Sequence, residues 1–193
     1  MSKRILFCLC LVPATLFAQD QQSREWKYKG EVSGSLGLGQ FYHGDDALGK
    51  GPDLAVGFGF RPFSGALRGL GFEVLGNRCA FEKEWGNGYS HDGQMRSITG
   101  NALYHFGRSR TQFYVVGGIG MLTADYVSIN PYDPNHVGTV KDSKMATNFG
   151  AGVKTRITSR ISLRPELRVF DTTIGKGYNW SHVRLSIGLG YHF

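Results

Sequence analysis

The sequence has too few cysteines for a disulfide framework and no apolar run long enough for a spanning helix. Of its three cysteines, Cys8 and Cys10 lie in the first apolar stretch, so Cys79 has no partner for an internal bridge once that stretch is removed. Beyond this stretch there is no run of about 18 consecutive apolar residues, which excludes helical membrane spans. The mean hydropathy of −0.23 is as typical of a soluble protein as of strands whose residues alternate between lipid and a polar interior.

The N-terminal stretch has the layout of a secretory signal peptide. Lys3 and Arg4 precede an apolar run over residues 5–17, and Ala18 is a small residue suited to the position before cleavage. The apolar run is too short to span a membrane as a helix. We therefore predict that residues 1–18 are removed and that residues 19–193 form one domain.

A pattern of apolar residues alternating with glycine recurs six times, at residues 36–39, 56–60, 69–72, 118–121, 149–153 and 187–191. Its period of two is the strand period. In a soluble sandwich, the face opposite the apolar one would carry polar groups, and glycine would weaken the strand. In a narrow barrel within a membrane, bulky apolar residues face the lipid and small residues face the crowded interior. The pattern therefore favours a transmembrane barrel.

Two further segments, 97–106 and 161–169, alternate without the glycines. In the second, Arg164, Glu166 and Arg168 share one face, and three ionised groups cannot face lipid. Pro165 cannot donate to a strand ladder, so we predict a bulge there. Strands are then expected near residues 29–40, 53–61, 67–79, 95–106, 112–122, 147–157, 161–170 and 182–193.

The expected connections alternate in length. Residues 62–66, 107–111 and 158–160 are short, whereas 41–52, 80–94, 123–146 and 171–181 are long and polar. Short periplasmic turns and long extracellular loops are typical of an outer-membrane barrel with both termini in the periplasm. We predict an all-β fold, an eight-stranded antiparallel transmembrane β-barrel with up-and-down meander order and a packed polar lumen.

Aromatic residues group at both expected ends of the strands. One group comprises Trp26, Tyr28, Phe63, Tyr104, Phe106, Phe113, Tyr191 and Phe193, and the other comprises Phe41, Tyr42, Phe81, Trp85, Tyr126, Tyr178 and Trp180. Two such groups predict aromatic girdles at the two membrane interfaces.

The net charge of +7 raises the question of nucleic-acid binding, which the positions of the charges disfavour. The long expected loops carry more acidic than basic residues, and no basic stripe with stacking aromatics emerges. The basic surplus includes Arg108, Arg110 and Arg160 at short turns, where arginine can meet anionic phospholipid head groups. We expect no nucleic-acid partner.

Residues 186–193 match the C-terminal signal of outer-membrane barrels, with Ser186, Gly188, Tyr191 and Phe193 at its four defining positions. With the signal peptide and the strand count, the chain from residue 19 onward resembles the OmpA/OmpX-like small outer-membrane β-barrel family. The resemblance implies that the barrel-assembly machinery reads the last strand, and that outer-membrane lipids and lipopolysaccharide surround a monomer.

Strand parity places a set of charged residues in the lumen: Glu31, Glu73, Lys154, Arg156, Arg164, Glu166, Arg168 and Arg184. The interior of an eight-stranded barrel is just wide enough for its side chains, so we predict a buried ion-pair network. The alternative is a gated narrow pore in which Glu73 or Glu166 exchanges partners among the arginines.

No catalytic, cofactor or metal site is predicted. Lipid A deacylases of similar size carry a His and a Ser two residues apart on the outer face, whereas His182 directly follows Ser181 and Ser186 points inward. Loose analogues of an omptin-type site are Asp45, Asp46, Asp133 and His136, which fit solvated loops better. His43 with Asp45 and Asp46, or Asp133 with His136, lacks the regular spacing of a recognised metal site.

The favoured function is therefore a non-enzymatic outer-membrane protein with a structural or surface-interaction role. The third expected loop, 123–146, is the longest and offers Tyr126, Pro131, Tyr132 and Pro134 as contacts. A narrow porin-like channel for small solutes or ions is the alternative, followed by a lipid A-modifying or proteolytic enzyme. A soluble lipocalin-like barrel is the architectural rival, and it requires apolar residues inside and polar residues outside.

Overall fold

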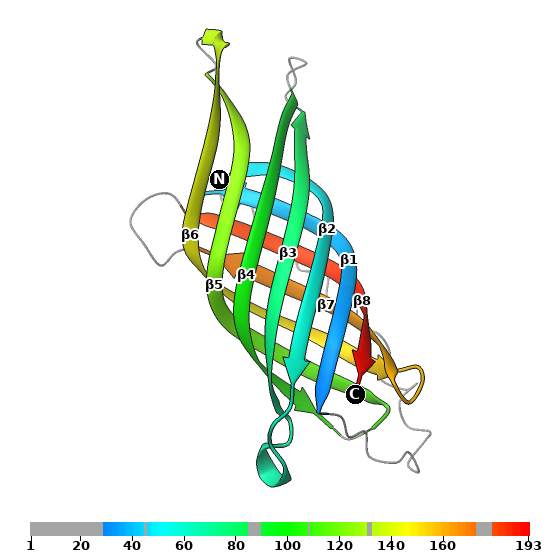
Figure 1. Cartoon of the computed structure of the whole chain (residues 1–193). Helices are drawn as coiled ribbons and strands as arrows, with labels where there is room; N and C mark the ends of the chain where they lie inside the picture. Colours follow the sequence, from blue (N-terminus) through cyan, green and yellow to red (C-terminus); the bar gives the residue numbers. More distant parts are fainter. Residues whose placement is uncertain (1–28, 45, 85–89, 108, 131–132, 173–178) are drawn as a thin grey trace, which may run out of the picture.

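Eight antiparallel strands close into a barrel, each paired with its neighbours in sequence and β8 paired with β1 (Figure 1). The computed structural model describes residues 29–44, 46–84, 90–107, 109–130, 133–172 and 179–193. The strands are β1 (Gly30–His43), β2 (Asp46–Phe60), β3 (Leu70–Glu84), β4 (Ser90–Phe106), β5 (Thr111–Asn130), β6 (Asp133–Arg156), β7 (Ile161–Asp171) and β8 (Trp180–His192). A short 3-10 helix, η2 (Gly65–Leu67), lies between β2 and β3. The predicted fold class and meander order are confirmed.

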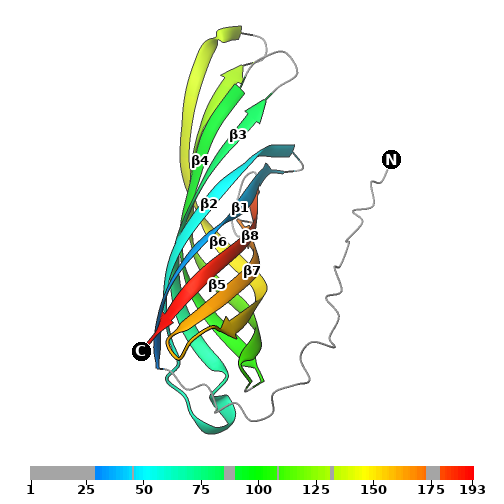
Figure 2. The same ribbon diagram turned by 90° about the vertical axis from the view of Figure 1, so that its right-hand side faces the viewer.

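The two ends of the barrel differ. At one end Gly30 and Phe193 exchange two backbone hydrogen bonds of 3.0 Å, and we call this the terminal end. At the opposite, distal end, β3, β4, β5 and β6 rise beyond the other four strands (Figure 2). The β5–β6 ladder continues there from Leu122–Lys144 to Ile129–Val137. The distal end is therefore an open-sided sheet standing on one wall of the barrel.

The outer surface of the barrel is apolar. Leu36 is 63% exposed and pairs with Leu54 on one side and Ile187 on the other, which are both 55% exposed. Comparable residues continue around the wall, among them Val56, Phe58, Val74, Ile98, Ile119, Phe149, Leu185 and Leu189. A continuous belt of this kind exceeds the apolar patches of soluble monomers and fits contact with lipid. The lipocalin-like arrangement is therefore excluded. Among the described residues, no helix is long and apolar enough to cross a membrane.

The strands extend further at the distal end than the sequence pattern predicts. Most of the expected loops 41–52, 80–94 and 123–146 are strand, with residues 45, 85–89 and 131–132 outside the described part. The alternation of apolar residues stops in these segments, but the backbone ladder continues. Side-chain alternation reports the environment of a strand. In these segments the outward residues, such as Gln40 and Glu82, are polar and the inward residues, such as Phe41, are apolar, so the pattern of a lipid-facing wall is lost. The loop prediction for these segments was wrong.

Pro165 interrupts a ladder without a bulge. Between β6 and β7, Gly152 pairs with Glu166 and Thr155 pairs with Leu163 at the same register, while the two intervening positions are unpaired. The missing amide of proline therefore costs ladder contacts and leaves the register intact, so the predicted bulge was wrong. A register shift occurs instead between Phe41 and Tyr42 on β1.

The aromatic residues form one outward girdle, at the terminal end. Phe63, Tyr104, Phe106, Phe113, Tyr191 and Phe193 are each at least 40% exposed there. At the distal end, the prediction of a lipid-facing girdle was wrong for three residues, because Phe41, Phe81 and Trp180 are buried inside the barrel. Trp26, Tyr28, Trp85 and Tyr178 lie outside the described residues.

The lipid-facing wall predicts a position-dependent cost for charge. Leu36→Arg places a cation in the middle of the apolar belt, whereas Gln40→Arg places it on the same exposed face of β1 near the distal end. We expect the first variant to lower the free energy of unfolding in lipid vesicles by about 2–4 kcal/mol and the second by at most about 1 kcal/mol. Urea titrations followed by tryptophan fluorescence measure both values. Equal values for the two variants would contradict a lipid-facing belt.

Candidate functional site

The centre of the lumen is an ion-pair network built around Glu166. Its Oε2 atom lies 2.8 Å from Nη2 of Arg164 and 2.8 Å from Nη2 of Arg168, all three on β7. Its Oε1 atom lies 3.2 Å from Nη1 of Arg184 on β8. One carboxylate therefore holds three guanidinium groups. The period of two along β7 turns Arg164, Glu166 and Arg168 to the same interior face.

Glu73 on β3 links this group to the opposite wall. Its two oxygens lie 2.6 Å from Arg164 and 2.9 Å from Arg168. Tyr114 on β5 donates a 2.8 Å hydrogen bond to Glu166 and accepts a 2.7 Å bond from Nε of Arg164. These contacts cross the lumen and bind strands that are not neighbours in the sheet.

At the terminal end, the network is completed by Glu31 on β1. Glu31 pairs with Lys154 of β6, and its carboxylate lies 3.8 Å from Arg164 and 3.7 Å from the ring of His192. Next to these residues, a cavity of about 20 Å³ opens between Glu31, Glu73, His105 and Arg61. That volume holds about one water molecule, so it is a small recess and not a channel.

At the distal end, the network terminates at Asp53 on β2. Its Oδ1 atom lies 2.7 Å from Nε of Arg184, and its Oδ2 atom accepts a 2.9 Å hydrogen bond from Asn77 and lies 3.1 Å from Nε2 of His182. Arg184 therefore bridges Asp53 and Glu166, and the ion pairs form one continuous chain from Glu31 to Asp53.

Among the residues whose burial the structure describes, the buried charges balance. Four acidic residues (Glu31, Asp53, Glu73 and Glu166) and four basic residues (Lys154, Arg164, Arg168 and Arg184) are each at most 7% exposed. A buried charge without a partner is costly, and equal numbers of each sign allow every group to be paired. The network can therefore remain fully ionised in a lumen that excludes bulk water.

The structure brings seven of the eight predicted luminal residues into this network. Arg156 is the exception: it is half-buried near the terminal mouth and, within the described part of the chain, makes no ion pair. Its backbone carbonyl accepts a 2.7 Å hydrogen bond from Nε of Arg110. At this position β6 lies outside the crowded part of the lumen. The inward parity of Arg156 therefore did not ensure an acidic neighbour.

The distal half of the lumen is apolar, which corrects the prediction of a polar lumen throughout. A buried cluster fills it: Phe41, Ala55, Leu75, Cys79, Phe81, Met95, Leu122, Ala124, Ala146, Phe170 and Trp180. The rings of Phe41 and Phe81 stack with centroids 5.2 Å apart, and Trp180 meets Phe41 edge-on at 6.0 Å. We call these residues the apolar plug. In the described part of the lumen, the chain of ion pairs is therefore followed toward the distal end by a cluster of apolar side chains.

Sequence reasoning missed three interior residues of the site. Asp53 is absent from the predicted luminal set, although it is the first residue of an expected strand and has the parity of the inward-facing Ala55 and Gly57 on β2. Tyr114 and His182 alternate with outward residues on β5 and β8 in the same way. All three lie within the expected strands, so applying parity to every polar and aromatic position of those strands would have placed them in the lumen.

The residues of the predicted assembly signal divide between the two faces of β8. Ser186 and Gly188 face the lumen, whereas Tyr191 and Phe193 are 47% and 61% exposed on the outside. Of the loose catalytic and metal candidates, His43 pairs with Asp46 at the tip of the β1–β2 hairpin. Asp45 lies outside the described residues, and Asp133 and His136 lie in β6, apart from that hairpin in the ladder.

An apolar outer belt, a paired polar lumen and a closed meander together define a transmembrane β-barrel protein. A model of the outer membrane protein β-barrel domain matches residues 7–193, and the chain belongs to this family. Membership of the family indicates the bacterial outer membrane. No curated protein sequence matches the chain.

Solved structures of small outer-membrane barrels share the fold. Neisserial surface protein A (NspA) has a TM-score of 0.67 at 17% identity, over 85% of this chain and 97% of that one. OprG from Pseudomonas aeruginosa has a TM-score of 0.55 at 11% identity, over 88% and 99% of the two chains. Ail from Yersinia pestis, solved in complex with the heparin analogue sucrose octasulfate, has a TM-score of 0.52 at 14% identity, over 84% and 99%.

The geometry predicts that Glu166 is the most sensitive position of the lumen. Glu166→Gln keeps the size of the side chain but leaves three arginines with one carboxylate fewer. Removing one partner of a buried ion pair typically costs about 3–5 kcal/mol. We expect a loss of this size in the free energy of unfolding in lipid vesicles. Glu82→Gln, on an exposed side chain of β3, is the control and should cost less than about 1 kcal/mol. A loss below 1 kcal/mol for Glu166→Gln would refute the central role of this carboxylate.

Proposed function

We propose that this chain is a non-enzymatic outer-membrane barrel whose lumen is closed and whose function lies at its distal surface. The observation that carries the proposal is the filling of the lumen by two successive layers. The ion-pair network occupies the terminal half and the apolar plug occupies the distal half. A solute would have to separate buried ion pairs and then pass through a packed apolar cluster, and both steps are costly.

The proposed orientation places both termini in the periplasm and the distal end outside the cell. Its support is the difference between the connections at the two ends. At the terminal end, β5 begins at Thr111 soon after β4 ends at Phe106, β7 begins at Ile161 soon after β6 ends at Arg156, and residues 61–69 hold only η2. Short periplasmic turns and longer extracellular extensions are the common arrangement in this class of barrel.

The sheet that β3–β6 form beyond the barrel is the proposed interaction surface (Figure 2). It is held by a continuous ladder and by a 2.8 Å hydrogen bond between the hydroxyls of Thr123 and Ser143. Lys141 and Asp142 are exposed on β6. A hydrogen-bonded sheet presents its side chains at fixed spacing, so it can bind a partner with little loss of conformational entropy. The acidic surplus of the distal segments does not favour a polyanion such as the one bound by Ail.

The positions of three of the six histidines support a non-enzymatic role. His105, His182 and His192 are buried in the lumen, where lipid and large substrates do not reach. His182 is oriented by Asp53, but the apolar plug covers it. An enzyme acting on lipid or on protein needs its acid–base group within reach of the substrate.

The channel alternative is tested by conductance. Residues 19–193, which hold all eight strands, are refolded and inserted into a planar lipid bilayer, with a general porin as the positive control for insertion. We expect no conductance steps from the folded barrel, because both halves of its lumen are filled. Reproducible steps whose size changes in Glu73→Gln would overturn the proposal in favour of a narrow channel. Folding is verified by the heat-dependent mobility of the barrel in gel electrophoresis.

The surface role is tested by shortening the β5–β6 hairpin. Residues 127–139 are replaced by Asn-Gly, which closes two-residue hairpins, so that Tyr126 and Val140 remain paired as the last rung. Because the deleted part lies beyond the barrel, we expect the variant to fold with normal heat-dependent mobility. We expect cells expressing the full-length chain to aggregate and to adhere to polystyrene, and cells expressing the shortened variant to lose both properties. Unchanged adherence at equal surface expression would count against the role of this sheet.

A further inference from the structure

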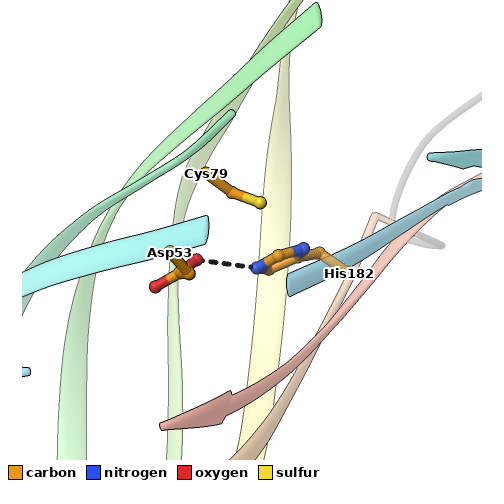
Figure 3. A group of neighbouring side chains, drawn as sticks. All are labelled: Asp53, Cys79 and His182. Carbon is orange, nitrogen blue, oxygen red and sulfur yellow. Dashed lines mark hydrogen bonds and ion pairs between the residues drawn. The ribbon is translucent and has the colours of Figure 1, made fainter. Parts of the chain in front are cut away.

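A group of metal-ligating side chains lies where the ion-pair network meets the apolar plug. Asp53 of β2, Cys79 of β3 and His182 of β8 each offer one ligand atom, and these atoms lie within 4.8 Å of one another (Figure 3). The three side chains are at most 1% exposed. They come from strands far apart in the sequence, which is why residue spacing did not reveal them.

Of the two ring nitrogens of His182, only one has a hydrogen-bond partner among the described residues. Its Nε2 atom lies 3.1 Å from Asp53, which accepts the ring proton, while Nδ1 has no hydrogen-bond partner among the described residues. Cys79 is also poorly satisfied, since the nearest acceptors of its thiol are carbonyl oxygens at 3.8 and 3.9 Å. A buried nitrogen without a partner is unfavourable, and a bound cation would satisfy it.

The imidazole of His182 and the thiol of Cys79 pack against Gly39 on β1, where a side chain would stand at any other residue. A Cβ atom there would overlap Cε1 of His182 and lie 2.6 Å from the Cys79 sulfur. Any other residue at this position would push the imidazole and the thiol apart. The absence of a side chain at Gly39 therefore allows the imidazole of His182 and the thiol of Cys79 to lie close together, although they have no direct bond to each other.

Met95 adds a second sulfur. It lies directly opposite Cys79 in the β3–β4 register and is 0% exposed in the same buried cluster. The Cβ atoms of opposed residues are about 5 Å apart, so its flexible thioether can reach the Cys79 sulfur. A thiolate, a thioether and an imidazole form a soft donor set, which selects Cu(I) over hard cations.

The charge of the lumen favours a monovalent ion. The four buried acids and four buried bases already balance. A monovalent cation that replaces the thiol proton of Cys79 leaves this total unchanged, and the proton leaves to solvent. A divalent ion in the same position would add an uncompensated positive charge next to Arg184, whose Nε lies 2.7 Å from Asp53.

We propose that Cys79, His182 and Met95 bind a soft monovalent metal ion of the Cu(I) class. Asp53 is a positioning residue: it accepts the Nε2 proton of His182 and so leaves the lone pair of Nδ1 for the metal. Arg184 and Asn77 hold the Asp53 carboxylate in that orientation. Such a carboxylate behind a ligating histidine is a recurring support for metal sites. The ion joins β3, β4 and β8 at the edge of the apolar plug, to which Cys79 and Met95 belong.

The test is copper retention by the refolded barrel. Residues 19–193 contain Cys79 as their single cysteine and are refolded anaerobically with a slight excess of Cu(I), because the folded site is closed to solvent. Bicinchoninate then removes weakly held copper. We expect one copper per folded chain, with X-ray absorption showing both sulfur and imidazole neighbours. No retained copper, or a spectrum without sulfur, would overturn the proposal.

Variants assign the ligands. Cys79→Ser and His182→Asn should abolish retention, and Asp53→Asn should weaken Cu(I) affinity about 10–100-fold. Met95→Leu should weaken it as well, whereas Met121→Leu, on an outward side chain that is 46% exposed, should not. Equal retention by wild type and Cys79→Ser would refute the site. Stoichiometric retention of Zn²⁺ without Cu(I) would refute the monovalent assignment. If a variant misfolds, the X-ray absorption spectrum of the wild type alone decides whether sulfur and imidazole bind the copper.

Discussion

The structure depends on the neutralisation of charge inside a space that side chains fill completely. Glu166 contacts three arginines, and each of these contacts at least one further acid. In water such pairs contribute little, but in a lumen that excludes bulk solvent their attraction is larger and the cost of losing a partner is larger still. Each strand must therefore place its luminal charges at the same height as the opposite charges of other strands. This requirement selects one register around the whole barrel.

Long-range pairs carry this constraint through the chain. Glu31 and Lys154 are 123 residues apart and still share a buried ion pair. Near them, glycine gives room for a large group: a Cβ atom on Gly152 would overlap the ring of Tyr114. The phenol that reaches Glu166 therefore needs a strand neighbour without a side chain. The recurrent glycines and the luminal charges are thus two parts of one packing solution, because the eight-stranded interior leaves no spare volume.

The sequence predicted which face of a strand each residue occupies where apolar and polar residues alternate strongly. It did not predict contacts that depend on the three-dimensional closure of the barrel. Parity placed Arg164, Glu166 and Arg168 inside, because three ionised groups at period two leave no other face. It could not pair Glu73 with Arg168 or Asp53 with Arg184, since those contacts depend on closure of the barrel. Strand ends were underestimated where lipid no longer imposes a pattern. Phe41 and Trp180 were assigned to the lipid interface because aromatic composition does not reveal which face of a strand carries the ring.

The two layers of the lumen strengthen each other. The apolar plug separates the network from the distal solvent, which lowers the local dielectric constant and increases the attraction between Arg184 and Asp53. In return, the network ties β2, β3, β7 and β8 together beneath the plug and fixes the spacing into which Phe41, Phe170 and Trp180 pack. Hydration of one layer would therefore weaken the other. In the proposed function, this mutual support between the two layers is what allows the barrel to carry a projecting sheet for surface binding without admitting solutes.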